Sequence, residues 1–182
     1  LSVLSYGGLV LNRLVKIRGE HFDSAVASLV RHNEEFLIGR LTAERLRREF
    51  GVSDEDTGTR FTVFGRDRLT GVPSQMDVRI SLVRAAMKEP LEECVRAIRS
   101  MIDRTPPDVR RGIEAKGIYL TGGIANLRGL STYLEESIGL PVTTVPDPDL
   151  CAVKGLQKIN LSKAYYKKLT YSMLDEDYRW LR

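Results

Sequence analysis

The sequence predicts an α/β protein in which helices cover a sheet and a small α+β module is inserted between helices. Three observations predict this class. Strand-like and helix-like segments alternate along the chain, a strand-like run ends in the pair Gly122 and Gly123 before an apolar-periodic segment, and a hairpin pattern interrupts two helices. Alternation of this kind is typical of sheets that pack against helices.

Composition is that of an ordinary globular protein. The 182 residues suffice for one substantial core or two small ones, and hydrophobic residues make up 42% of the chain. The formal net charge of +4 is small against 28 basic and 24 acidic side chains, so the composition does not indicate a nucleic-acid partner. The sequence contains no apolar run of the roughly 18 residues that a membrane span needs.

Cysteine and histidine are sparse. Cys94 and Cys151 are the two cysteines, and His21 and His32 lie apart without acidic or thiol partners at ligand spacing. The sequence therefore predicts neither a disulfide framework nor a zinc site. Cys94 falls on the apolar face of a predicted helix, which favours a buried free thiol. We expect a reduced, cytosolic protein.

The first half of the chain reads as a hairpin followed by helices. A glycine turn at Gly7 and Gly8 separates two strand-like runs, over residues 1–4 and 9–17. Apolar spacing predicts a helix over 22–33 and a connector over 36–39. A second helix is expected to begin with Thr42 as its N-cap and to end at Gly51.

The inserted module and the helix after it occupy the middle of the chain. Residues 60–64 and 75–80 alternate in polarity and predict a second hairpin. Ser81 is the expected N-cap of a long helix that runs to Arg104, and Pro90 should kink or split it. A short helix with Pro107 near its first turn follows.

The last third contains the strand–glycine–helix segment. Residues 118–120 predict a strand, and helices are expected over 127–137 and 150–159 with a strand over 141–145 between them. The tail over 161–182 mixes basic and aromatic residues. It is interpreted as a solvated terminal helix with a loose end, or alternatively as a surface that binds a membrane or a partner.

Two glycines after a strand permit two readings. A backbone without Cβ atoms can approach a phosphate or ribose closely, and a helix that follows offers unpaired N–H groups to it. The same pattern also forms a plain βα turn. The turn alone does not decide between them.

Several segments, taken together in order and spacing, resemble one family. The chain from Ser2 to about Asn160 is similar to the bacterial actin homologue MreB, of the rod shape-determining MreB/Mbl family, in the superfamily of actin, DnaK-class chaperones and sugar kinases. The matching segments are Arg18-Gly-Glu-His-Phe-Asp23, Ile38-Gly-Arg-Leu-Thr-Ala-Glu-Arg-Leu-Arg47, Gly65-Arg-Asp-Arg-Leu-Thr-Gly-Val-Pro73, Arg104-Thr-Pro-Pro-Asp108, Gly117 to Leu130 and Val153-Lys-Gly155.

The resemblance implies an actin-like ATPase (ribonuclease H-like) fold, of which the chain holds the C-terminal half. It implies that residues 1–50 and 88–160 form subdomain IIA, that residues 51–87 form the inserted subdomain IIB, and that residues 161–182 form the tail. The N-terminal half, with its phosphate loops, and a central strand of the IIA sheet are expected to be missing. An incomplete sheet of this kind is expected to aggregate or to dimerise by strand exchange.

The resemblance also implies where a nucleotide lies. Thr121, Gly122 and Gly123 match the adenosine motif, and Ile124 stands where the family usually has a third glycine. Gly19 and Glu20 match a turn near the phosphates, and Glu44 and Arg47 match positions that flank adenine and ribose. The family's usual lysine is replaced by Arg47, and a solvated helix face is the alternative for this pair. No catalytic or metal-binding residue is assigned.

The function that the resemblance implies is an ATP-binding, filament-forming bacterial cytoskeletal protein that organises cell-wall synthesis and rod shape. ATP with Mg²⁺ is the expected cofactor of the full-length protein, and the alternative that this chain by itself binds none stays open. This chain alone should have no ATPase activity. A scaffold that has lost ATP binding is the alternative, which Ile124 and the basic, aromatic tail motivate. A chaperone or sugar kinase of the superfamily is a further one.

The expected partners are other copies of the chain and an adaptor. The family forms head-to-tail filaments of paired protofilaments, and a membrane-protein adaptor docks on subdomain IIA. Direct membrane contact is not inferred from this chain. The expected location is the cytoplasm, at the inner face of the cell membrane.

Overall fold

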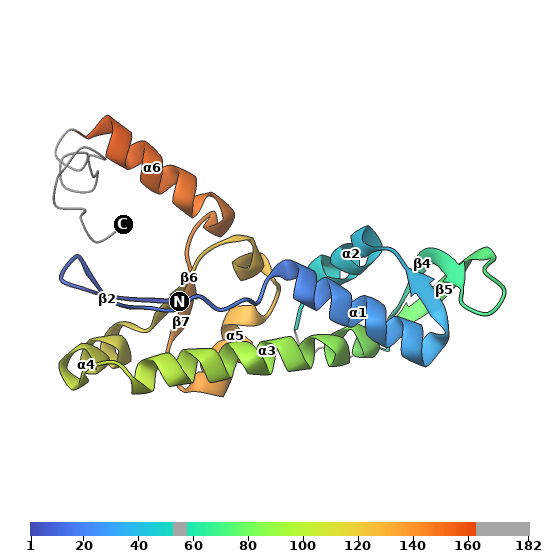
Figure 1. Ribbon diagram of the computed structural model, residues 1–182, viewed down its shortest axis with the longest axis horizontal. Helices are drawn as coiled ribbons and strands as arrows, with labels where there is room; N and C mark the ends of the chain where they lie inside the picture. The colour runs from blue at the N-terminus through green and yellow to red at the C-terminus, as the bar shows by residue number, and fades with distance from the viewer. Residues whose placement is uncertain (53–57, 163–182) are drawn as a thin grey trace, which may run out of the picture.

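The computed structural model describes residues 1–52 and 58–162, and the long helix α3 (Ile80–Asp103) runs along most of its length. A small antiparallel sheet lies at one end of α3 and the helix α4 (Pro107–Lys116) at the other (Figure 1). The core is continuous along this axis. It joins side chains of α1, α2 and α3 to those of the segments before and within α5.

The small sheet has the order β3-β4-β5, with strands Phe36–Ile38, Arg60–Asp67 and Pro73–Arg79. The predicted hairpin over the last two is confirmed, but the predicted connector over 36–39 was wrong because β3 pairs with β4. Gly65 permits this pairing, since a Cβ there would lie 2.3 Å from the carbonyl oxygen of Leu37. The sheet thus includes a strand from before the predicted module, whose boundaries stay a prediction.

Helices α1 (Gly19–Glu34) and α2 (Arg40–Phe50) pack on each other and on α3. The apolar spacing that predicted α1 is confirmed, since Phe22, Val26 and Val30 are buried. The predicted N-cap at Thr42 was wrong. Gly39 is the N-cap of α2, and its carbonyl accepts the N–H of Ala43 at 3.0 Å.

Helix α3 is a single element that begins at Ile80, after the N-cap Arg79 rather than at the predicted Ser81. The alternative in which Pro90 splits it was wrong. Pro90 is buried inside the helix, beside the buried side chains of Met87 and Leu91. Burial of this apolar stripe outweighs the one backbone hydrogen bond that proline removes.

The chain after α4 builds a parallel pair of strands, β6 (Ile118–Leu120) and β7 (Val142–Thr144). Between them lie a four-residue 3₁₀ helix, η1 (Gly123–Asn126), and α5 (Leu130–Ile138). The predicted helix over 127–137 thus begins three residues later. A 3₁₀ turn, rather than an α-helix, follows the two glycines.

The N-terminal hairpin pairs β1 (Ser2–Ser5) with β2 (Gly8–Asn12), which ends well before the predicted residue 17. Among the described residues, β1–β2 and β6–β7 form separate two-stranded sheets. The expectation that a central strand is missing between them stays a prediction. The resulting prediction of aggregation or strand exchange stays a prediction.

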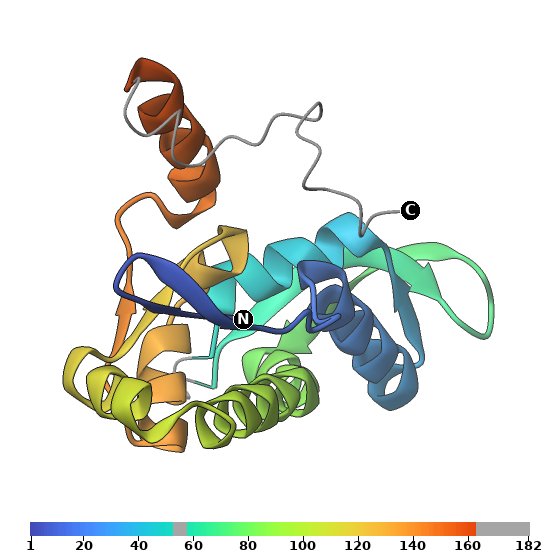
Figure 2. The same cartoon turned by 60° about the vertical axis from the view of Figure 1, so that its left-hand side comes forward.

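The chain ends, within the described residues, in η2 (Pro148–Leu150) and α6 (Cys151–Leu161). Helix α6 stands apart from the body (Figure 2), and it contains no buried residue. The interpretation of the tail falls on residues 163–182, which lie outside the described residues. In the described ranges, none of the helices has the length and apolarity to cross a membrane.

Cys94 is a half-buried free thiol on α3. Burial raises the pKa of this thiol above its ordinary value, and the neighbouring Glu93 charge adds to the effect. A thiol of raised pKa is a poor nucleophile near neutral pH. This agrees with a structural role.

The tip between β4 and β5 is held by Asp67. Its Oδ1 accepts the backbone N–H groups of Leu69 (2.9 Å) and Thr70 (2.7 Å) and the Thr70 hydroxyl (2.9 Å). These hydrogen bonds, with those of Thr70 first, lower the pKa of Asp67 below its ordinary value. The carboxylate therefore stabilises the turn at neutral pH.

We predict that acid loosens this tip before the core. The pKa of Asp67 is lower in the folded protein than in the unfolded chain, so its contribution is present above the unfolded pKa. The contribution is lost as the pH falls through the folded pKa. The hydrogen-exchange rate of the Thr70 amide, measured by NMR and divided by the rate of an unprotected amide at the same pH, should rise as the pH is lowered. The Asp67→Asn variant should lack this rise. Equal pH profiles in both proteins would contradict the prediction.

Candidate functional site

Three of the predicted site residues meet at the start of α1. A Cβ placed on Gly19 would lie 3.2 Å from Nη2 of Arg47 and 3.3 Å from Cδ1 of Ile124. Residues of α1, α2 and η1 are thus brought to one point, although they are far apart in the sequence. A side chain at position 19 would be tightly packed, and the ends of the Arg47 and Ile124 side chains would have to shift by a few tenths of an ångström to admit it.

Arg47 is buried beneath this point, and its partner is an acid that the sequence reasoning missed. Its Nε donates to Oδ1 of Asp23 at 2.6 Å, and both side chains are almost wholly buried. Asp23 lies one turn into α1 from Gly19. The available signal was its place in the matching segment 18–23, but an acid inside a helix is by itself usually solvated.

Glu44 lies one turn before Arg47 on α2. Its side chain is about one-third exposed, and Oε1 lies 3.0 Å from Nε of Arg48 and 4.0 Å from Nη2 of Arg47. Of the predicted pair, Glu44 therefore reaches the surface while Arg47 is held inside. The alternative of a solvated helix face was wrong for Arg47, because burial with Asp23 withdraws its guanidinium from solvent.

The glycine turn is open to solvent. Thr121, Gly122 and Gly123 are exposed, and a Cβ at either glycine would meet no atom within 4 Å. Gly122 has φ +86°, and its N–H donates to the carbonyl oxygen of Pro148 at 2.6 Å. The turn is thus anchored on one side and unobstructed on the other.

Ile124 packs toward the body of the protein. Its side chain is half-buried, contacts Gly19 and packs against the main core. It therefore fixes the turn against α1 and does not fill the open space beside Gly122. Glu20, by contrast, points outward and forms an exposed ion pair with Arg40 at 3.3 Å.

The described residues do not form a set of side-chain ligands for a metal ion at this site. Among the described residues, no three His, Cys, Asp or Glu side chains are grouped as a metal would require. Mg²⁺ in nucleotide sites is commonly held by phosphates, water and one or two carboxylates. No described residue of this chain is therefore assigned to it.

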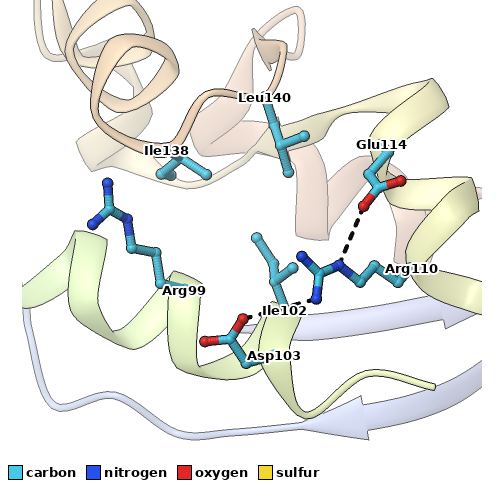
Figure 3. A pocket seen from close by; sticks show the side chains of 7 residues that line it. All are labelled: Arg99, Ile102, Asp103, Arg110, Glu114, Ile138 and Leu140. Carbon is cyan, nitrogen blue, oxygen red and sulfur yellow. Dashed lines mark hydrogen bonds and ion pairs between the residues drawn. The ribbon is translucent and has the colours of Figure 1, made fainter. Parts of the chain in front are cut away.

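A cavity of about 190 Å³ lies at the C-terminal end of α3, and Figure 3 shows the side chains that line it. Its walls come from the end of α3, from α4 and from the end of α5. Ile102, Ile138 and Leu140 supply apolar surface, while Arg110 is held at its rim by Glu114 (3.2 Å) and Asp103 (4.0 Å). Sequence reasoning did not find this cavity, since its residues come from three separate helices.

Comparison with known proteins gives a consistent result. Residues 1–168 match the family model described as "MreB/Mbl protein". The chain is 36% identical over 156 residues to the cell shape-determining protein MreB of Escherichia coli (strain K12), covering 85% of this chain and 45% of that protein. It is 29% identical over 173 residues to the cell shape-determining protein Mbl of Bacillus subtilis (strain 168), covering 93% and 52%.

Solved structures agree on the fold. The structure of MreB5 of Spiroplasma citri bound to AMPPNP matches with a TM-score of 0.84 at 24% identity, covering 92% of this chain and 50% of that one. A MamK double helical filament matches with a TM-score of 0.67 at 19% identity, covering 81% and 46%. The chain spans about half the length of the relatives it matches, and its α/β fold is part of an actin-like fold. Because the family model matches nearly the whole chain, this protein belongs to the MreB/Mbl family.

Proposed function

We propose that this chain is part of a cytoskeletal protein that binds ATP at the glycine turn and assembles head to tail to organise cell shape. The observation that carries the proposal is the open turn at Gly122 and Gly123, which Ile124 fixes beside Gly19 and α2. Family membership supports it, as does the AMPPNP-bound state of the MreB5 structure.

The chemistry of the site suits a nucleoside. Backbone that lacks Cβ atoms can lie flat against a ribose or an α-phosphate. The exposed part of the Glu44 carboxylate can accept hydrogen bonds from sugar hydroxyls. The scaffold alternative was motivated by Ile124 and by the basic, aromatic tail. The Ile124 side chain lies toward Gly19 and the core, which does not favour that alternative, and the tail falls outside the described residues.

The test is calorimetric titration of the chain with Mg·ATP. Gly123→Leu adds a side chain on the open side of the turn, where the protein has room for it. We expect an unchanged melting temperature and an affinity at least about tenfold weaker, since the ligand loses close contact. Gly112→Leu, at an open position on α4, is the matched control. Equal affinities for the two variants, or failure of the full-length protein that contains this chain to bind, would exclude ATP binding at this turn.

Head-to-tail assembly is supported by two features at opposite ends of α3. At one end Leu69 projects from the β4–β5 tip with 83% of its surface exposed, on a turn that Asp67 holds. At the other end lies the cavity with the apolar residues Ile102, Ile138 and Leu140. When a protruding side chain at one end of a chain fits a cavity at the other end of the next copy, the contact is heterologous. Such a contact does not close on itself and propagates as a filament.

We predict that Leu69→Lys raises the concentration needed for assembly by about tenfold or more. In the proposed contact Leu69 is buried in the cavity of the next copy, and the variant places a positive charge there beside Arg99 and Arg110. Sedimentation at increasing concentration measures this. Leu41→Lys, at another strongly exposed leucine on α2 (74%), should behave as the unaltered chain. Pairing of strand edges would be unaffected by either variant, so equal assembly of both would exclude the Leu69 contact.

A further inference from the structure

The buried pair Asp23–Arg47 has no direct part in the proposed nucleotide contacts. Both charges are removed from water, which is costly, and well-packed apolar residues of similar volume often serve stability equally well. The pair therefore calls for a role besides stability. Its position, directly beneath Gly19 and one turn from Glu44, places that role at the nucleotide site.

Arg47 lies between two acidic side chains, of which Asp23 is buried and Glu44 is partly exposed. Its Nε donates to Asp23 at 2.6 Å, whereas its Nη2 lies 4.0 Å from Oε1 of Glu44, beyond hydrogen-bonding distance. Arg48 contacts the same oxygen of Glu44 from the solvent side. Asp23 thus draws the guanidinium inward, and Glu44 stays at the surface.

We propose that Asp23 is a positioning residue for sugar recognition: by holding Arg47 inward, it leaves the Glu44 carboxylate available to the vicinal hydroxyls of a ribonucleotide. The proposal rests on the proposed ATP site. When the charge at position 23 is removed, the nearest carboxylate to Arg47 is Glu44. The guanidinium then moves toward Glu44, and the two groups satisfy each other instead of the sugar.

The test compares ATP with 2′,3′-dideoxy-ATP, which lacks both sugar hydroxyls, by calorimetric titration. A hydroxyl bonded to a carboxylate contributes about tenfold or more in affinity, so the unaltered chain should prefer ATP by that factor. In Asp23→Asn this preference should fall to about twofold or less, while affinity for the dideoxy nucleotide changes little. Glu35→Gln, which breaks an exposed ion pair with Arg68 elsewhere, should retain the full preference.

A purely structural role is separated by a second variant. Arg47→Lys also removes the Nε–Asp23 hydrogen bond, but its single ammonium group goes to the buried Asp23 and leaves Glu44 available. It should therefore keep the preference for ATP. If the pair serves stability alone, the two variants should lose affinity for both nucleotides in parallel. Arg47→Lys remains informative where Asp23→Asn does not fold, since a lost preference in Arg47→Lys overturns the proposal.

A double-mutant cycle completes the experiment. Glu44→Gln should lower the preference for ATP, and Asp23→Asn should lower it no further in that background, because Asp23 acts through Glu44. Additive losses overturn the positioning role while leaving ATP binding intact. No binding of either nucleotide by the full-length protein that contains this chain overturns the proposed function, and the positioning role with it.

Discussion

Gly51→Ala is expected to destabilise the protein by about 3 kcal/mol or more. Gly51 ends α2 with φ +58° and ψ −148°, a conformation that is essentially restricted to glycine. A Cβ at this position would lie 2.2 Å from the carbonyl oxygen of Arg128. That oxygen cannot move away freely, because it accepts the N–H of Val52 at 2.8 Å.

Urea unfolding measures the effect. Gly112→Ala is the control, since the interior of α4 has space for the methyl group there and alanine should stabilise a helix by about 0.5–1 kcal/mol. The junction between α2 and the segment before α5 is held by the Val52–Arg128 hydrogen bond, so the loss should include this whole contact. A Gly51→Ala protein within about 0.5 kcal/mol of the unaltered chain would contradict this account.

Arg47→Met is expected to cost about 3–5 kcal/mol of unfolding free energy, because it leaves the Asp23 carboxylate buried without its cation. The double variant Asp23→Leu/Arg47→Met should recover most of this loss, since no buried charge remains. Denaturant unfolding of the two variants measures the difference. The double variant should also keep the sugar preference of the unaltered chain, because no guanidinium remains at position 47 to pair with Glu44.

A double variant no more stable than Arg47→Met would show that the pair cannot be replaced by apolar packing at this site. An Arg47→Met protein of unaltered stability would show that solvent reaches Asp23. The first outcome contradicts the predicted recovery of stability, and the second contradicts the burial described for the pair.

The local patterns predicted α1, α3, the β4–β5 hairpin and the β6–glycine–β7 region, because each has a periodicity or a turn of its own. They failed at β3. A three-residue strand has no recognisable period, and it forms because Phe36 is buried and its backbone pairs with Asp67. The boundaries of α2 and α5 also shifted, since backbone contacts rather than side-chain caps define their ends.

The position of the candidate site was predicted in outline. Ordered motifs pointed to Gly19, Glu44 and the glycine turn, and the structure brings Gly19 to Arg47 and Ile124. The roles of the individual side chains in the site were not predictable, because the type of an amino acid does not reveal which side chain it pairs with in the fold. Arg47 could not be assigned to the interior until Asp23 was found beneath it.

The sequence by itself determined the family, the α/β class and the segments that carry the candidate site, because these depend on local pattern and on ordered motifs along the chain. Only the tertiary structure decided which charged side chain is buried and which reaches solvent, where Ile124 points, and that a cavity opens at the C-terminal end of α3. The physical reason is the same for all three. Burial and cavity shape depend on contacts between segments distant in sequence, and no local pattern specifies those contacts.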